Sequence, residues 1–231
     1  MTGSDEQMVL PFEEEPDYAV KAFIVASSNR HAFNWIERWP DWPFTALILV
    51  GPAGCGKTHL ATHWQKRSKA ASIDLGTAGI EQAAALTADG QAILVEDCDR
   101  VLGETQAERA LLQLYNLAKA AGSRLLLTAR RVPSLWSLQL PDLQSRLNSA
   151  MVVVIDPADD ELLRSVAAKL FGDKRVQVGE EVVSYLLSRG ERSVAGVAHA
   201  VETLNEISMK RQRPITVPMA REVLLQPEDE S

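Results

Sequence analysis

The stretch Gly51-Pro52-Ala53-Gly54-Cys55-Gly56-Lys57-Thr58 fits the pattern G-x-x-x-x-G-K-[ST]. The five residues before it read ALILV, an unbroken apolar run that predicts a strand buried on both faces. The residues from Thr58 to about Lys69 predict a helix. A glycine-rich turn between a buried strand and a helix is the context in which this pattern binds phosphate.

The loop has the residue types that a phosphate site needs. Glycines let backbone amides converge on phosphate oxygens, and the amino-terminal end of a helix adds positive potential. Lys57 would reach the outer phosphates, and the hydroxyl of Thr58 would ligate Mg²⁺. A chance glycine-rich turn is the alternative, and both flanking segments argue against it. The predicted nucleotide-binding residues are Gly51, Pro52, Ala53, Gly54, Cys55, Gly56, Lys57 and Thr58.

Short apolar runs continue along the chain and alternate with helical patterns. They lie at 92–95, 124–128 and 151–155. This alternation predicts an α/β fold whose parallel sheet is covered by helices on both faces. After Asp156-Pro157 the pattern is helical only, at about 159–171, 179–189, 193–209 and 216–225. We therefore predict a flexible tail, an α/β nucleotide-binding domain, a helical lid and an acidic tail, over 1–16, 17–157, 158–226 and 227–231 respectively.

The second apolar run ends in two carboxylates, Glu96 and Asp97. In phosphoryl transfer one such carboxylate holds Mg²⁺ through water and the next orients the attacking water. We predict the metal role for Glu96 and the catalytic role for Asp97. Glu96 stands where Asp is usual, and its extra methylene displaces the carboxylate by about 1.5 Å. The alternative is a solvated strand end.

Composition limits the classes of function. The 231 residues carry a formal net charge of -7, which argues against a surface that grips DNA phosphates or reads DNA sequence directly. Cys55 and Cys98 have no spacing typical of a disulfide framework or a metal site. No run approaches the roughly 18 apolar residues of a membrane span, and the acidic start is unlike a signal peptide. We expect a cytoplasmic protein.

Four further stretches lie in the order found in one family. They are AFIVASSNR at 22–30, GKTHL at 56–60, LPDLQSRL at 140–147 and ITVP at 215–218. Over roughly residues 7–225 the chain resembles the AAA+ module of the DnaA replication initiators, and within that family its shortened Hda branch. The resemblance implies an AAA+ P-loop NTPase with a helical lid. The helix-turn-helix DNA-binding domain of the initiators is not expected here.

The resemblance also implies individual roles. Phe23 and Ile24 approach the adenine base, and His59 belongs to the extended phosphate loop. Thr128 is the first sensor, and Arg146 is an arginine finger that acts on a neighbour's nucleotide. A guanidinium forks onto phosphate oxygens, which suits that role. From spacing alone Arg146 could equally cap local carbonyls or pair with a nearby Asp.

Two positions depart from the family pattern. Ala195 stands where the lid usually offers a sensor arginine, with Arg192 three residues earlier, and Arg130 replaces an acidic residue. With Glu96, these changes predict weak intrinsic ATPase activity. Nucleotide binding is less affected, because Lys57 and the loop amides remain. The resemblance implies ADP as the working ligand, although the residues themselves do not decide between ADP and ATP.

An apolar hexapeptide, QMVLPF at 7–12, lies between acidic residues before any pattern that could bury it. It resembles the peptide with which several bacterial proteins bind the replicative sliding clamp. Gln7 would offer its amide, Leu10 and Phe12 would fill an apolar pocket, and Pro11 would reduce the ordering cost. The alternative is docking of the tail on its own domain.

Three functions therefore compete. The first is a regulator that binds nucleotide and the clamp and promotes hydrolysis of DnaA-bound ATP, preventing re-initiation of replication. The second is an autonomous ATPase of helicase-loader type. The third is a clamp-binding scaffold without catalysis. AAA+ modules meet head to tail, and the sequence also allows a homodimer or a larger homo-oligomer.

Overall fold

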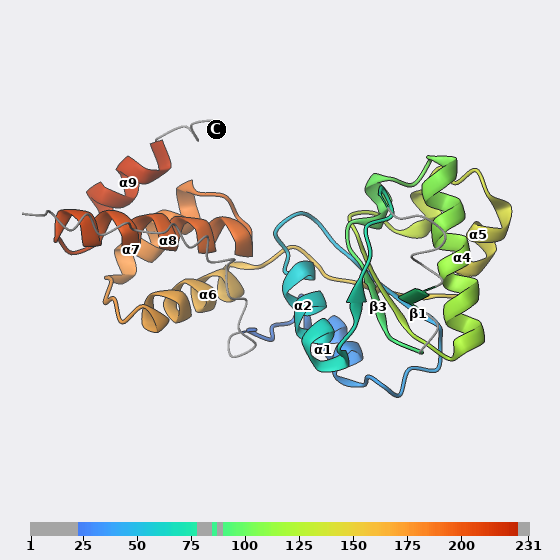
Figure 1. Cartoon of the computed structure of the whole chain (residues 1–231). Helices are drawn as coiled ribbons and strands as arrows, with labels where there is room; N and C mark the ends of the chain where they lie inside the picture. Colours follow the sequence, from blue (N-terminus) through green and yellow to red (C-terminus); the bar gives the residue numbers. More distant parts are fainter. Residues whose placement is uncertain (1–22, 78–84, 87–89, 226–231) are drawn as a thin grey trace, which may run out of the picture.

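The computed structural model describes residues 23–77, 85–86 and 90–225. These residues form a parallel sheet followed by a bundle of helices (Figure 1). The strands are β1 (Ala46–Val50), β2 (Ala71–Ser72), β3 (Ile93–Val95), β4 (Leu125–Ala129) and β5 (Met151–Val154). Four of them were predicted from the sequence to within one residue at each end. β2 has two residues and was not predicted.

The strand order is β2-β3-β4-β1-β5, with every pair parallel. β4 therefore separates β1, which leads into the glycine-rich loop, from β3, which ends in the carboxylates. Val50 is in register with Ala129, and Val95 with Leu127. Since the strands are parallel, their carboxyl ends meet at one edge, where an α/β fold places its ligand.

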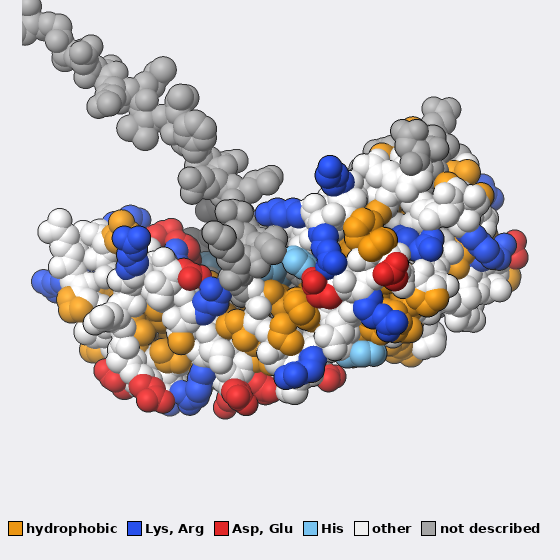
Figure 2. Space-filling model, turned by 90° about the horizontal axis from the view of Figure 1, so that it is seen from below, with side chains coloured by type: hydrophobic (Ala, Val, Ile, Leu, Met, Phe, Trp, Pro, Cys, Tyr) orange, Lys and Arg blue, Asp and Glu red, His pale blue; other side chains and the backbone are white. Residues whose placement is uncertain are grey.

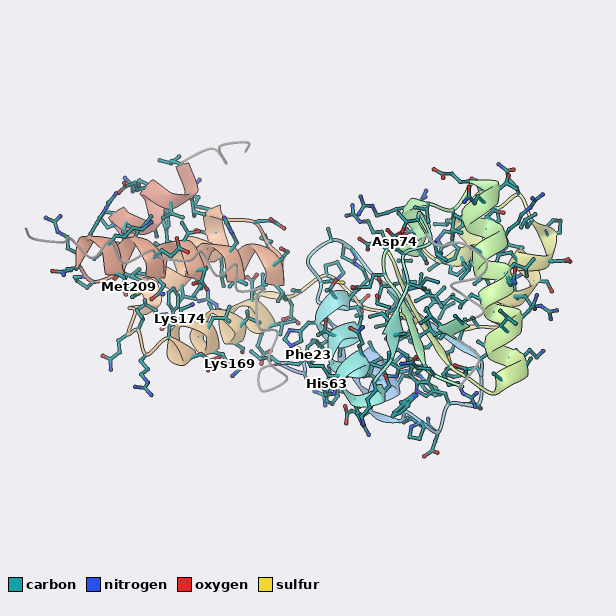
Figure 3. All side chains as sticks on the ribbon, in the orientation of Figure 1. Phe23, His63, Asp74, Lys169, Lys174 and Met209 are labelled. Carbon is teal, nitrogen blue, oxygen red and sulfur yellow. The ribbon has the colours of Figure 1, made fainter. Side chains whose placement is uncertain are left out.

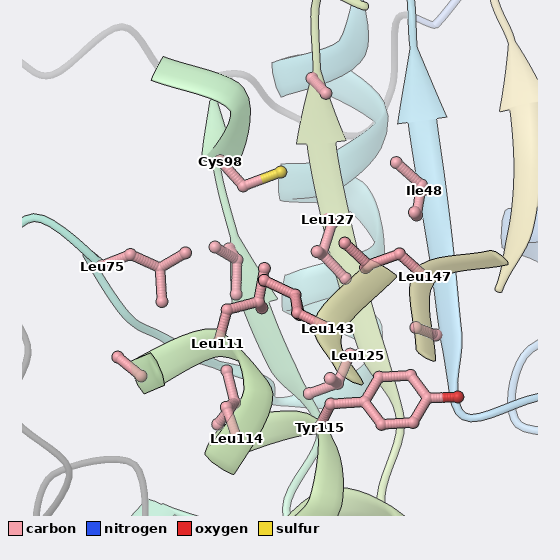
Figure 4. Close-up of a cluster of buried hydrophobic side chains, with 14 of the residues drawn as sticks. Ile48, Leu75, Cys98, Leu111, Leu114, Tyr115, Leu125, Leu127, Leu143 and Leu147 are labelled. Atoms are coloured by element: carbon pink, nitrogen blue, oxygen red, sulfur yellow. The ribbon is translucent and has the colours of Figure 1, made fainter. Parts of the chain in front are cut away.

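Helices cover both faces of the sheet (Figure 1). On one face lie α1 (Arg30–Glu37) and α2 (Lys57–Ser68), and on the other α4 (Thr105–Ala121) and α5 (Pro141–Asn148). Along β1, Leu47 and Leu49 pack toward α2, whereas Ile48 packs toward α4 and α5 (Figure 4). All five β1 residues are therefore buried, which explains the unbroken run ALILV. Two short 3₁₀ turns connect elements, η2 (Cys98–Arg100) and η3 (Pro133–Leu135).

The remaining helices form a bundle with its own core. They are α6 (Asp160–Asp173), α7 (Glu180–Arg189), α8 (Val194–Arg211) and α9 (Val217–Leu225), as predicted to within about two residues. Phe171, Val201 and Leu204 are among its buried side chains. On the face that Figure 2 shows, acidic and basic side chains are interspersed. Within the described ranges no helix is both long enough and apolar enough to cross a membrane.

Candidate functional site

The loop between β1 and α2 has the backbone that phosphate binding requires. Its first amide, of Gly51, donates to the carbonyl oxygen of Ala129 (3.2 Å), which fixes the loop to the neighbouring strand. Gly54 (φ +70°) and Gly56 (φ +99°) lie in the left-handed region that other residues rarely adopt. Gly56 is the residue before α2, so the turn directs amides of the loop and of the helix start toward one point.

Lys57 is buried, with 7% of its surface exposed. Its ammonium donates to the carbonyl oxygens of Gly51 and Pro52, both at 2.9 Å. No carboxylate pairs with it among the described residues. The sulfur of Cys55 lies 4.0 Å from the same ammonium. A buried cation with these partners is suited to bind an anion, so the loop fits the phosphates of a nucleotide.

The predicted Mg²⁺ ligands, Thr58 and Glu96, come together at this edge. Burial raises the pKa of the Glu96 carboxyl, and the charge of Asp97 adds to the rise, whereas a hydrogen bond with Thr58 opposes it. Among the described residues, no three His, Cys, Asp or Glu side chains cluster as a metal site. Mg²⁺ takes few protein ligands and completes its shell with phosphate and water. Thr58 and Glu96 would hold the ion here.

Asp97 and Thr128 are joined across two neighbouring strands. The backbone amide of Asp97 donates to the Thr128 hydroxyl (2.8 Å), and Thr128 is buried. Asp97 adopts φ +45°, a conformation uncommon outside glycine. Such strain persists only where surrounding contacts hold it, and it gathers at functional sites. The backbone of the predicted catalytic residue is therefore fixed to the predicted sensor hydroxyl, while the Asp97 carboxylate pairs with Arg100 at 3.7 Å.

Asp99 is a site residue that the sequence did not reveal. It is 9% exposed, and its Oδ2 accepts from the backbone amides of Arg130 (3.0 Å) and Arg131 (3.1 Å). These bonds fix the turn that follows Thr128. In the sequence Asp99 could have been noticed as a further acidic residue just after Glu96 and Asp97. The amides that it binds lie about thirty residues away along the chain, so no local pattern indicates its role.

The residues predicted to approach the base lie between the two parts of the chain. Phe23 stacks on Phe33, with ring centroids 5.8 Å apart, and meets the edge of His59 at 5.4 Å. It lies beside α2 on the side of the lid (Figure 3). Ile24 packs instead against the apolar core of the lid. Burial lowers the pKa of His59, which favours its neutral form in this aromatic group.

Asn29 shapes this segment and was also missed as a site residue. Its side chain accepts from the amide of Ala26 and donates to the carbonyl oxygen of Ile24, both at 2.9 Å. Asn29 is 3% exposed. The stretch that carries Phe23 is thereby held as a fixed turn against α1.

The lid meets the loop at the start of α8. The amide of Val194 donates to the carbonyl oxygen of Gly54 (3.1 Å). Ala195, which the resemblance aligns with the lid's sensor position, is exposed. Arg192 pairs with Asp160 at the start of α6, so its guanidinium is engaged within the lid.

Arg146 lies on α5, whose buried residues pack on the α4 face of the sheet, whereas α2 covers the opposite face. It is half-buried. In the part of the chain that the structure describes, its guanidinium makes no hydrogen bond and no ion pair, so Asp142 does not hold it. The alternatives of local capping and of pairing are therefore not realised. The motif QMVLPF at 7–12 lies outside the described residues.

The sheet order, the loop that joins β1 to α2 and the helical bundle define the class of protein: it is an AAA+ P-loop fold with a carboxyl-terminal lid. The family model "Hda, lid domain" matches residues 161–224. A Haemophilus influenzae protein described as uncharacterized is 30% identical over 228 residues, covering 95% of this chain and 99% of that protein. The chain belongs to the Hda-like, DnaA-related AAA+ family.

Solved structures agree on the fold. Domain III of the Thermotoga maritima replication initiation protein DnaA superposes with a TM-score of 0.76 at 20% identity, over 91% of this chain and 96% of that one. AMPPCP-bound DnaA from Aquifex aeolicus gives a TM-score of 0.66 at 17% identity, over 85% and 69%. The Thermotoga maritima RuvB branch migration motor gives 0.63 at 15% identity, over 78% and 61%.

Proposed function

We propose that this protein regulates the initiation of bacterial DNA replication by promoting hydrolysis of the ATP bound to DnaA. The observation that carries the proposal is the guanidinium of Arg146, which has no partner among the described residues and lies on the face of the sheet opposite α2. An arginine that is not engaged at its own phosphate loop is available for a neighbour's nucleotide. Membership of an Hda-like, DnaA-related family supports DnaA as that neighbour.

The protein's own nucleotide is ADP or ATP, held by the loop amides and Lys57. Mg²⁺ between Thr58 and Glu96 would neutralise phosphate charge. The lid contributes a backbone contact at Gly54 and no arginine, because Ala195 is at the sensor position and Arg192 is paired with Asp160. A site with fewer cations at the outer phosphate loses less binding free energy when that phosphate is absent. We therefore propose ADP as the working ligand.

On DnaA the chemistry would be carried by Arg146. Its fork of N–H donors would bind oxygens of the phosphate being transferred, where negative charge develops in the transition state. The attacking water, Mg²⁺ and the phosphate loop would be those of DnaA. The hexapeptide 7–12 would bring the protein to the clamp on replicating DNA and raise its local concentration beside DnaA.

The test is ATP hydrolysis by ATP-bound DnaA in the presence of clamp-loaded DNA and the full chain with ADP. Arg146→Ala should lower the stimulated rate by about 10³-fold, the lower end of the range for arginine fingers. Arg189→Ala is a matched control, because Arg189 is exposed in the last turn of α7, and it should leave the rate unchanged. An unchanged rate in Arg146→Ala would refute the proposal.

A second function is favoured by one observation, the hydrogen bond that joins Asp97 to Thr128 at the strand ends. This arrangement is what an autonomous ATPase would use. Steady-state hydrolysis by the purified protein distinguishes the two: a rate that is lost in Asp97→Ala and indifferent to DnaA supports autonomous turnover. Clamp binding lost in Leu10→Ala/Phe12→Ala, with no effect of Arg146→Ala, would instead indicate a scaffold.

A further inference from the structure

Glu108, on α4, is fully buried, with 0% of its surface exposed. Among the described residues no lysine, arginine or histidine pairs with it. Its Oε1 accepts from the amides of Gly103 and Gln139, both at 3.0 Å, and its Oε2 from Gln139 and Leu140, both at 2.9 Å. A buried carboxylate is costly unless hydrogen bonds compensate its charge. Backbone amides supply that compensation here.

The amides that Glu108 binds lie at the beginning of α5. Leu140 is the residue before the helix, its side chain cannot accept a hydrogen bond, and Pro141 begins the helix without an amide hydrogen. In a capping box, a Glu within the helix accepts from the backbone amide of the residue before it. For α5 that Glu comes from another helix. Its negative charge also lies at the positive end of α5.

A second set of hydrogen bonds strengthens the same junction. The side-chain amide of Gln139 donates to the carbonyl oxygen of Gly103 (2.7 Å), and the Thr105 hydroxyl donates to Gln139 Oε1 (3.0 Å). Gln139 and Thr105 are both exposed, so the junction runs from the surface down to the buried carboxylate. These side-chain hydrogen bonds join the turn before α4 to the start of α5.

The rest of α5 is also fixed against α4. Leu143 and Leu147 are buried in the cluster that includes α4 residues (Figure 4). At the far end, the hydroxyls of Tyr115 and Ser149 lie 3.1 Å apart. α4 therefore holds α5 at its first turn, along its buried side and just after its last residue.

Arg146 lies between these anchor points. The Ser149 hydroxyl donates to its backbone carbonyl (2.6 Å), but in the described part of the chain nothing holds its guanidinium. The position of that guanidinium therefore follows from the position of α5. A catalytic group displaced by about 1 Å can lose about 10²-fold in rate.

We propose that Glu108 is a positioning residue for Arg146: through the amides of Gln139 and Leu140 it sets the place of α5 and hence of the guanidinium. This inference rests on the proposed function of Arg146. Glu108→Gln is the sharpest change, because it keeps the size of the side chain but replaces one accepting oxygen by an NH₂ group. That group is a donor and would face the backbone amides, which are also donors. Glu104→Gln is the matched control, since Glu104 is exposed and its side chain does not cap α4.

The experiment measures ATP hydrolysis by DnaA with clamp-loaded DNA and the full chain with ADP. Glu108→Gln should lower the maximal stimulated rate about tenfold, and the concentration for half-maximal stimulation should stay within about twofold of wild type. Glu104→Gln should retain the rate. The double variant Glu108→Gln/Arg146→Ala should be no slower than Arg146→Ala alone, because Glu108 acts through Arg146.

Each outcome is decisive. A full rate in Glu108→Gln beside a lost rate in Arg146→Ala overturns the positioning role and leaves the proposed function intact. A further loss in the double variant also overturns it, since the residues would then act separately. A full rate in Arg146→Ala overturns both. If Glu108→Gln fails to fold, Glu108→Asp keeps the carboxylate but shortens its reach to the amides of Gln139 and Leu140. It should lower the rate about threefold, again without effect in the Arg146→Ala background, and an unchanged rate refutes the inference.

Discussion

Val194 and Gly54 are joined by a backbone hydrogen bond of 3.1 Å that ties the first residue of α8 to the phosphate loop. The contact occurs next to Ala195, which is exposed. The lid is thus coupled to the loop through main-chain groups. A ligand that shifts the loop shifts the carbonyl oxygen that α8 binds, so nucleotide binding and lid position are linked.

This contact predicts the effect of Gly54→Ala. A Cβ at residue 54 would lie 2.6 Å from Ser193 Oγ and 2.7 Å from Ser193 Cβ, and φ is +70°. We expect ADP affinity, measured by calorimetry, to fall about tenfold or more, because both the loop and the lid must shift. Adding Ser193→Gly should restore part of the affinity, since it removes the clash but not the backbone strain. Wild-type affinity in Gly54→Ala would disprove the coupling.

Thr128 predicts a stability effect that is separable from catalysis. Its hydroxyl accepts from the amide of Asp97 at 2.8 Å, and Thr128 is buried. Thr128→Val keeps the shape but leaves that amide without its partner, so the free energy of unfolding should fall by about 1–2 kcal/mol in urea denaturation. Thr128→Ser keeps the hydroxyl and should lose less. Equal stability of the Val variant and wild type would show that the bond is not formed.

Glu96 predicts a pH dependence. Its pKa in the folded protein is raised above 4.5, with burial as the largest cause. The folded state therefore binds the proton more tightly than the unfolded state. The contribution of Glu96 to the free energy of unfolding decreases as pH rises from 4.5 through its raised pKa in the folded protein. At pH 7 nucleotide-free Glu96→Gln should melt slightly above wild type, by a small amount because Glu96 is exposed to solvent, and the difference should vanish below about pH 4.5. Glu161→Gln, a change at an exposed lid residue, is the control; no difference at pH 7 contradicts the prediction.

The same residue predicts opposite behaviour when Mg²⁺ is present. A protonated carboxyl is a poor metal ligand, so Mg²⁺ dependence of ADP binding should weaken as pH falls toward the raised pKa of Glu96. In Glu96→Gln the Mg²⁺ dependence should be weak at every pH. A titration of ADP binding with and without Mg²⁺ at several pH values measures both.

Much of the fold follows from local patterns, and the reasons are physical. β1 has both faces buried, so its whole sequence is apolar and its bounds were predicted without error. Among the described strands β2 pairs with β3 alone, and it spans two residues, too few for a periodic signal. α5 has eight residues and begins with proline; a helix this short depends on tertiary anchors such as Glu108 more than on propensity. The place of β4 between β1 and β3 has no local cause in the sequence.

The residues of the site also fall into those that a local pattern predicts and those that it does not. The loop 51–58 is predictable because its chemistry and its backbone depend on adjacent residues. Asn29, Asp99 and Glu108 were missed because each holds backbone groups of a turn or helix start through long-range or context-dependent bonds. Backbone amides carry no sequence signature, so only the structure shows which carboxylate or amide side chain serves them.

Lys57 predicts how the protein responds to nucleotide. Its ammonium donates to two loop carbonyl oxygens at 2.9 Å, and the residue is 7% exposed, so a bound phosphate would meet a charge that is already largely removed from water. At about 100 times its dissociation constant ADP stabilises a fold by about 2.7 kcal/mol, which for a domain of this size raises Tm by about 5–10 °C. Lys57→Ala should abolish that rise, whereas Lys119→Ala, at an exposed position on α4, should retain it. An undiminished rise in Tm with ADP in Lys57→Ala would show that the nucleotide does not bind at the glycine-rich loop. Among the described residues no other group at this edge offers a buried cation.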